Sequence, residues 1–267
     1  MRSTRVIAFA NNKGGSGKST TASNIGAALA LSGKRVLMID GDMQMNLTLS
    51  FMDEEQALQY AQSEENLYHV IKDGKDLSDT IIPTAIEHLS LVPSSTLMSG
   101  IEFDLFTKWQ REFILKKALD GIKSAEEYDY VLIDAPPTLG GWVMNILCAA
   151  DDVVIPVEAS PWGIFGLANM VDFVNEVQRI APQVSILGIT ITKADERKKY
   201  FKETAAALKE QNAFPVFETI IHTDSAIEWA QDQSMPVVTC KRSSRSAKEY
   251  TELAKEIEKH ARRKKQH

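Results

Sequence analysis

The chain has 267 residues, of which 44% are hydrophobic and 25% are charged, and it carries a net charge of −6. This ordinary globular composition excludes a disordered chain, a fibrous repeat and a disulfide-stabilised miniprotein. The two cysteines, Cys148 and Cys240, form no CxxC pair, so we expect no zinc or iron–sulfur site built by this chain alone. No apolar run approaches the roughly 18 residues that a membrane span needs. We therefore expect a soluble, cytoplasmic protein without a transmembrane segment.

Short β-branched runs alternate with longer amphipathic stretches along the chain. The apolar runs predict seven strands, at residues 6–10, 35–39, 89–92, 130–133, 153–157, 184–191 and 216–219. Most are nearly continuous in apolar residues, which is typical of parallel strands buried on both faces. Between them, the helical period predicts helices at residues 18–31, 101–122, 164–180, 197–210, 224–231 and 245–260.

This alternation predicts an α/β fold in which helices flank a doubly wound, mainly parallel sheet. No Pro- or Ser-rich linker divides the chain, so we interpret residues 1–267 as a single domain. The more polar residues 53–90 are interpreted as two short surface helices. On the helix at 101–122, Trp109, Phe113 and Leu119 are expected to pack in the core or at an interface.

The strongest motif lies between the first strand and the first long helix. It consists of Asn11, Asn12, Lys13, Gly14, Gly15, Ser16, Gly17, Lys18, Ser19 and Thr20. The glycines allow a tight turn whose N–H groups approach phosphate oxygens, and the following helix points its positive end at the same place. Lys18 supplies charge for the β- and γ-phosphates, and the Ser19 hydroxyl is suited to bind Mg²⁺. A strict P-loop has glycine at position 12; this chain has Asn12 there, and a second lysine, Lys13, follows it.

Aspartates follow two later strands. Asp40 and Asp42 come after the strand at 35–39, and Asp134 comes after the strand at 130–133. The carboxyl ends of strands in open α/β sheets form the ligand-binding edge, so these side chains can converge on the phosphate loop. Asp134 is suited to hold Mg²⁺ through a water molecule, and either Asp40 or Asp42 to orient an attacking water.

Together these motifs resemble the ParA/MinD family of deviant-Walker P-loop ATPases, which includes the partition proteins. Residues 13–20 match the family's Lys-Gly-Gly-x-Gly-Lys-[Ser/Thr]-[Ser/Thr] loop. Residues 40–44 match its Asp-x-Asp-Pro-Gln switch I, with Met43 in place of proline, and residues 134–137 match its Asp-x-Pro-Pro switch II. The resemblance covers nearly the whole chain and implies ATP and Mg²⁺ as cofactors.

The resemblance also implies residue roles. Lys13 would reach across a homodimer interface to the partner's ATP phosphates. Asp42 rather than Asp40 would position the attacking water, and Asp42 is also a candidate ligand of the Mg²⁺ ion. With Lys18 these are the expected catalytic residues of a slow, partner-stimulated ATPase. Two ATP molecules would be held between two subunits, and hydrolysis would release the pair. The family's late Ile-Pro-Arg is not matched by Ile221, His222 and Thr223, so the adenine contacts are not assigned.

Partition members of the family bind non-specific DNA as ATP dimers at the nucleoid and act with a centromere-binding adaptor protein. Residues 241–267 hold ten Lys or Arg against four Glu, a net charge of +6, so residues 1–240 carry −12. Lys and Arg contacts with phosphates suffice for sequence-independent binding. The DNA-binding candidates in this basic C-terminal helix or tail are Lys241, Arg242, Arg245, Arg262, Arg263, Lys264 and Lys265. The charge pattern alone fits a solvated helix equally well.

Two other branches of the family stay open as alternatives. A MinD-like, membrane-cycling ATPase would end in an amphipathic helix with bulky apolar residues, whereas residues 255–267 offer only Ile257. An iron-protein-like or metal-carrier ATPase would need cysteines at the dimer interface. Cys148 lies in an apolar run, which favours a small buried side chain, and Cys240 stands alone. The sequence does not identify the cargo.

Overall fold

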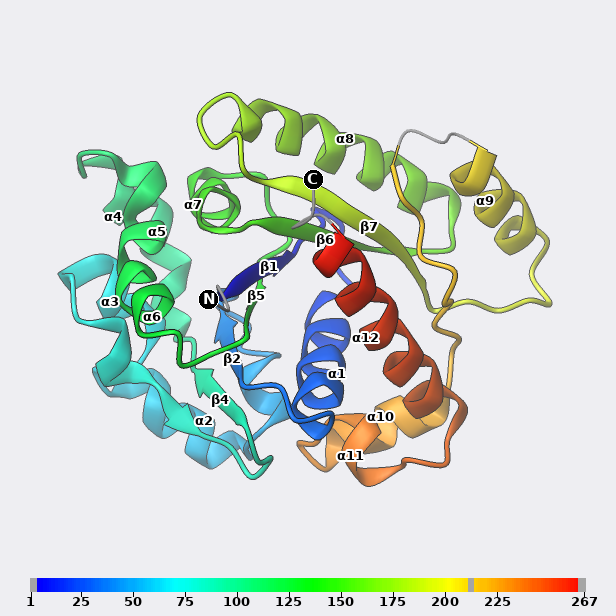
Figure 1. Ribbon diagram of the computed structural model, residues 1–267, viewed down its shortest axis with the longest axis horizontal. Coiled ribbons are helices and arrows are strands. Elements are labelled where there is room, and N and C mark those ends of the chain that lie inside the picture. Colours follow the sequence, from blue (N-terminus) through cyan, green and yellow to red (C-terminus); the bar gives the residue numbers. More distant parts are fainter. Residues whose placement is uncertain (1–3, 211–213, 264–267) are drawn as a thin grey trace.

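A seven-stranded sheet forms the centre of the computed structural model, which describes residues 4–210 and 214–263 (Figure 1). Its strands are β1 (Arg5–Phe9), β2 (Val36–Asp40), β3 (Ile82–Pro83), β4 (Leu89–Val92), β5 (Tyr130–Asp134), β6 (Asp152–Glu158) and β7 (Ser185–Thr192). They are ordered β3-β4-β2-β5-β1-β6-β7, and only β3 runs antiparallel to its neighbour. The predicted doubly wound, mainly parallel α/β fold is confirmed.

Helices cover both faces of this sheet. On one face lie α1 (Lys18–Leu31), α10 (Ser225–Asp232), α11 (Val237–Cys240) and α12 (Arg245–Arg263). On the other lie α3 (Leu67–Asp73), α4 (Ile101–Phe106), α5 (Ile114–Ala118), α6 (Asp120–Ala125), α7 (Gly141–Ala149), α8 (Pro161–Gln178) and α9 (Lys199–Glu210). Along β1, Val6 and Ala8 face this second layer, while Ile7 and Phe9 face α1. Both faces of a central strand are thus buried, which explains its unbroken apolar run.

The polar stretch at 53–90 contains the two expected short helices, α2 (Glu54–Gln62) and α3. Each begins at a residue whose side chain accepts a backbone N–H, Asp53 for α2 and Asn66 for α3. Such caps satisfy N–H groups that have no partner within the helix. Within the described residues, no helix has both the length and the apolar character that a membrane span requires.

The single helix expected at 101–122 is wrong. The helix α4 ends at Phe106, Gln110 adopts a left-handed φ of 50°, and a 3₁₀ turn (Arg111–Phe113) precedes α5 and α6. The break is stabilised from a distant element, because Asn145 of α7 accepts a hydrogen bond from Leu115 N at 3.0 Å and donates one to Arg111 O. Leu119 is buried as expected, but Trp109 does not pack in the core and is 96% exposed.

The strand expected at 216–219 is also wrong. The segment makes one isolated bridge to β7, between Ile189 and Val216, and two of its later amides donate to α12. Glu256 accepts Glu218 N at 2.7 Å and Thr219 N at 3.1 Å. A helix side chain therefore takes the hydrogen bonds that a neighbouring strand would otherwise supply.

We predict that Asn145→Ala destabilises the fold by about 1–3 kcal/mol, because it leaves buried backbone groups of the α4–α5 connection without partners. Thermal unfolding followed by circular dichroism should show a Tm lower by several degrees. Trp109→Ala is the matched control on the same connection and should leave the Tm nearly unchanged, since the indole is exposed. Equal Tm values for the two variants would contradict the capping role of Asn145.

Candidate functional site

The phosphate loop connects β1 to α1 and is hydrogen-bonded to the neighbouring strands β6 and β7. Gly15 and Gly17 have φ values of 73° and 84°, a region that favours glycine. Thr192, at the end of β7, donates to Ser16 O at 2.8 Å. Asn11 donates to Pro156 O of β6 at 2.6 Å and accepts Lys13 N at 3.0 Å. The loop is therefore shaped by β6 and β7 as well as by its own glycines.

Lys18 lies buried inside this loop. Its ammonium donates to Lys13 O at 3.4 Å, so the side chain follows the curve of the loop. Burial lowers the pKa of Lys18, and the nearby carboxylates of Asp134 and Asp42 oppose that shift. Gly17 precedes α1 and has no side chain to cap it, so the first N–H groups of α1 are left to a ligand.

Asp40 and Asp42, two residues apart, have different environments. Asp40 is buried and accepts Thr48 N at 2.8 Å, Thr48 Oγ1 at 2.7 Å and Asp42 N at 3.1 Å. Burial raises the pKa of Asp40 to about 6, against the pull of those hydrogen bonds. Asp42 instead lines the cavity described below. The geometry makes Asp40 the residue that shapes switch I and leaves Asp42 facing a ligand.

Asp134 is a buried carboxylate, and neither of its oxygens has a hydrogen-bond partner among the described residues. Burial, followed by the repulsion of Asp40, raises its pKa well above the usual range, while neighbouring Ser19 and Lys18 act against this rise. Leaving a carboxylate buried and unpaired is costly. A hydroxyl and carboxylates are the hard oxygen ligands that Mg²⁺ prefers. Ser19 and Asp134, with Asp42 nearby, therefore fit a magnesium ion.

The two switch segments touch each other directly. Gly41 N donates to Asp134 O at 2.9 Å, and the buried indole of Trp142 donates to Gly41 O at 2.8 Å. A Cβ atom on Gly41 would lie 2.7 Å from Asp134 O, so only glycine allows this approach. Trp142 N, at the start of α7, donates to Glu102 of α4 at 3.0 Å. Hydrogen bonds therefore connect Asp134 to switch I, α7 and α4.

A cavity of about 780 Å³ opens on these groups. Its phosphate side is lined by Gly14, Gly15, Gly17, Lys18, Ser19, Thr20, Asp42 and Pro137. The rest of the lining includes Thr192, Lys193, residues 221–224 and Tyr250, which the sequence did not assign. Thr192 ends β7 and Lys193 follows it, at the same edge of the sheet as the aspartates. That position in the sequence could have identified both residues as part of the site. The volume suits a nucleotide-sized ligand.

Comparison with known proteins identifies the family of this chain. Residues 4–186 match the family described as AAA domain. The chain is 35% identical to the sporulation initiation inhibitor protein Soj of Bacillus subtilis, over 95% of this chain and 98% of Soj. It is 31% identical to the chromosome partitioning protein ParA of Caulobacter vibrioides, over 95% and 93% of the two chains. The chain belongs to the ParA/MinD family of P-loop ATPases.

Solved structures of similar proteins contain nucleotides. Cobyrinic acid a,c-diamide synthase of Mycobacterium smegmatis, with a bound ATP analogue and magnesium, superposes with a TM-score of 0.82 at 29% identity, covering 97% of this chain and 96% of that one. A putative plasmid partition protein of Borrelia burgdorferi bound to AMPPNP gives a TM-score of 0.80 at 25% identity, covering 98% and 99%. This ParA/MinD-family chain is accordingly an ATPase that uses ATP and Mg²⁺.

The first loop lysine of this ParA/MinD-family ATPase is bound within its own subunit. Lys13 donates to Glu158 Oε2 at 2.5 Å and to Ser160 Oγ at 3.0 Å, at the connection between β6 and α8. It lies outside the set of residues that line the cavity. The ion pair is partly exposed, with 25% of the Lys13 side chain and 34% of the Glu158 side chain accessible to solvent. An external anion can therefore reach Lys13.

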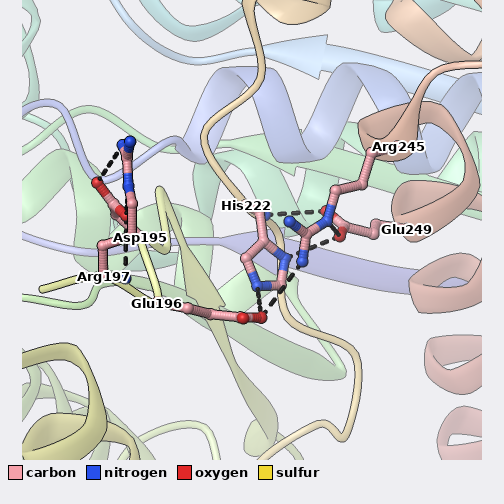
Figure 2. A network of polar contacts seen from close by, with 6 residues as sticks. All are labelled: Asp195, Glu196, Arg197, His222, Arg245 and Glu249. Atoms are coloured by element: carbon pink, nitrogen blue, oxygen red, sulfur yellow. Dashed lines mark hydrogen bonds and ion pairs between the residues drawn. The ribbon is translucent and has the colours of Figure 1, made fainter.

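The candidate DNA-binding residues of this ATPase differ in their contacts with other side chains. Lys241 lies 3.9 Å from the centre of the Trp229 ring, Arg245 pairs with Glu249 and Glu196 (Figure 2), and Arg262 pairs with Glu258. Arg242 is exposed and forms no ion pair with any other described residue. Arg263 is the last described residue of α12, and Lys264 and Lys265 lie outside the described residues. Among the candidates whose side chains the structure describes, Arg242 is therefore the one best placed to meet an external anion.

The two cysteines do not favour a cluster-binding relative. Cys148 is buried in α7, as expected, and burial raises the pKa of its thiol to about 11. A thiol held protonated in this way is a poor metal ligand. Within residues 4–210 and 214–263, no three His, Cys, Asp or Glu side chains form a metal-binding group of their own.

We predict that Lys18→Ala abolishes ATP binding, because the loop loses its central charge, whereas Asp42→Ala retains ATP but lowers the hydrolysis rate by about 10²–10⁴-fold. Isothermal titration calorimetry and phosphate release measure the two effects separately.

Asp40→Ala provides the control for Asp42→Ala. Because Asp40 holds Thr48 and Asp42 in place, its loss should lower the Tm, an effect that Asp42→Ala should not produce. Normal hydrolysis by Asp42→Ala would contradict the assignment of the switch I carboxylate.

Proposed function

We propose that the protein is a DNA-partition ATPase that dimerises on ATP, binds DNA without sequence preference and releases it after hydrolysis. The observation that carries this proposal is the deviant loop, with Lys13 ahead of Lys18, in a chain similar over nearly its whole length to chromosome-partitioning proteins. Either feature alone would fit several ATP-dependent processes. Together they favour the partition branch.

Within one subunit, the proposed chemistry uses the groups that line the phosphate side of the cavity. Lys18 and the loop N–H groups bind the β- and γ-phosphates. Ser19 directly and Asp134 through a water would hold Mg²⁺, which neutralises charge on the phosphates. Asp42 orients the water that attacks the terminal phosphate. The unpaired oxygens of Asp134 support this arrangement because they need a cationic or hydrogen-bonding partner.

Between two subunits, Lys13 would contact the phosphates bound by the partner. Its partly exposed pair with Glu158 supports this role, since a phosphate bound by the partner subunit could reach Lys13 and replace Glu158 as its anion. A second cation at the terminal phosphate stabilises charge in the transition state, as an arginine finger does, and is worth about 10³–10⁵-fold in rate. Hydrolysis removes the shared phosphate contacts, so the dimer then separates.

DNA would bind along the basic end of the chain, with Arg242 just before α12, Arg245 at its start and Arg262 near its other end. Joining two such surfaces in one dimer raises avidity without any new kind of contact, so binding would follow the ATP state. The membrane-cycling alternative is disfavoured by the packing of α12. Its apolar residues Leu253, Ile257 and Ala261 are buried in the core that α1 also forms, so they are not free to enter a bilayer.

A centromere-binding adaptor protein would complete the system by stimulating hydrolysis. The resemblance to partition proteins supports such a partner, and a nucleoid location of the ATP-bound dimer would follow from non-specific DNA binding. The cargo, whether plasmid, chromosome or another body, is left open by this proposal.

We predict that Lys13→Ala retains ATP in a monomer but loses ATP-dependent dimerisation and about 10³-fold or more in turnover. Size-exclusion chromatography with ATP and Mg²⁺ measures the first effect, and phosphate release the second. Mixing Lys13→Ala with Asp42→Ala should restore activity, because one site of the mixed dimer then has both an intact Asp42 and a partner Lys13. Glu158→Gln is the control and should still dimerise. Full activity of Lys13→Ala at high dilution would refute the shared site.

We predict that Arg242→Glu weakens duplex DNA binding by the ATP-bound protein equally for different DNA sequences and leaves basal ATP hydrolysis unchanged. The slope of log K against log salt should become shallower by about 0.9 for each phosphate that the variant no longer neutralises. Fluorescence anisotropy with two unrelated duplexes measures both effects.

Lys117→Glu is the charge-matched control for Arg242→Glu. Lys117 is exposed on α5, which packs on the sheet face opposite α12, so this change should leave DNA affinity intact. Equal DNA affinity with ATP and with ADP would contradict the partition role.

A further inference from the structure

Three large aromatic side chains lie open on α4 and on the connection that follows it. Phe103 is 82% exposed, Phe106 is 74% exposed and Trp109 is 96% exposed. Phe103 and Phe106 are three residues apart on α4, so they share one side of the helix. Phe106, Trp109 and Arg111 line an open cavity of about 190 Å³. We call these four residues the aromatic surface. Exposed apolar side chains that cluster in this way mark an interaction site.

Positive charge surrounds the aromatic surface. Residues 106–117 carry one acidic residue, Glu112, and four cations, Lys108, Arg111, Lys116 and Lys117. This stretch therefore has a net charge of +3 in a chain whose residues 1–240 carry −12. The Arg111 guanidinium lies 5.4 Å from the centre of the Phe106 ring, so one of these cations stands at the cavity itself. A partner that fits this surface combines an apolar side chain with carboxylates.

The helix α2 of the same chain has this chemistry. Residues 53–65 contain five Asp or Glu and no Lys, Arg or His. Leu58 is 45% exposed, and Glu54 and Glu55 lie four and three residues before it, on the same side of the helix. Both glutamates are exposed, and neither forms an ion pair with another residue that the structure describes. The helix thus presents one aliphatic side chain beside two unpaired carboxylates.

Within one subunit these two surfaces do not meet, because α2 and α4 stand well apart, with α3 between them in the view of Figure 1. We propose that the aromatic surface binds α2 of a second copy of this chain. Leu58 enters the cavity, and Glu54 and Glu55 face the cations of residues 106–117. The arrangement is a common mode of recognition, in which an amphipathic helix anchors an apolar side chain in a groove.

This contact is separate from the ATP-dependent dimer of the proposed function. Neither surface includes the phosphate loop, Lys13 or a residue that lines the nucleotide cavity. Self-association through the aromatic surface therefore needs no nucleotide. Because the opposing charges are exposed, salt screens them, and the contact weakens as the ionic strength rises. A contact centred on one leucine and a few aromatic rings is small, so it forms only at high protein concentration.

Sedimentation equilibrium of the nucleotide-free full chain tests the contact, with Lys13→Ala in every sample to remove the ATP-dependent dimer. The weight-average mass should rise above that of the monomer as the concentration increases, and rise less in high salt. Trp109→Ala and Leu58→Ser should each weaken association roughly tenfold or more, the loss expected for an apolar anchor. Phe165→Ala is the matched control and should change nothing, because Phe165 is 67% exposed on α8 rather than on either surface.

A charge exchange tests the pairing and guards against variants that merely misfold. Arg111→Glu, and Glu54→Lys combined with Glu55→Lys, should each reduce association. An equimolar mixture of these two proteins should associate again, because opposite charges then meet. A monomer at every concentration, association that Trp109→Ala leaves unchanged, or a mixture no better than its components would overturn the proposal. So would a shift of Trp109 emission on adding duplex DNA or phosphatidylglycerol vesicles to a protein that stays monomeric. Since no nucleotide is present, these outcomes are distinguishable from a failure of the ATP-dependent dimer.

Discussion

The buried carboxylate of Asp134 is the group on which the rest of the site depends. A charge of this kind would be expensive without a partner, and neighbouring Ser19 and Lys18 oppose the rise in its pKa. Lys18 is in turn buried by the loop and partly compensated by Asp134 and Asp42. Each of these groups is therefore incomplete without the others. Mg²⁺ would pair with the carboxylate of Asp134, and phosphate would pair with the ammonium of Lys18. Ligand binding would therefore also stabilise the site.

Hydrogen bonds connect Asp134, in switch II, to switch I and α7. Asp134 contacts Gly41, Gly41 contacts Trp142, and Trp142 contacts Glu102, all through hydrogen bonds between 2.8 and 3.0 Å. Interiors packed this tightly shift between discrete arrangements rather than deforming gradually. These hydrogen bonds give a direct connection from Asp134 to the start of α7. Asp40, which uses both of its oxygens inside switch I, keeps the segment folded.

The local parts of this structure could be predicted from the sequence, and the parts set by distant contacts could not. The loop at 11–20 could be recognised from its glycines and from the adjacent strand and helix, which lie within a short stretch, although its contacts with β6 and β7 could not be predicted. The strands could be predicted because burial on both faces leaves unbroken apolar runs. The errors lie at 107–113 and 216–219. There the backbone bonds to Asn145 and Glu256, which come 30 or more residues later in the chain. The cavity wall at 221–224 escaped assignment for the same reason, since its supports, Glu249 and Glu196, belong to other segments.

The helix α12 shows how one element can serve the core, the cavity and the surface together. Leu253, Ile257 and Ala261 pack on the sheet side, and Glu249 and Glu256 hold the backbone of residues 218–222. Its basic residues face outward, with Lys248, Lys255 and Arg262 spaced seven residues apart on the exposed side. A rigid helix cannot move one of these faces without moving the others. If the basic end of the chain binds DNA, as proposed, then α12 connects that surface to the cavity. By linkage, any coupling between nucleotide and DNA changes the affinity for each by the same factor.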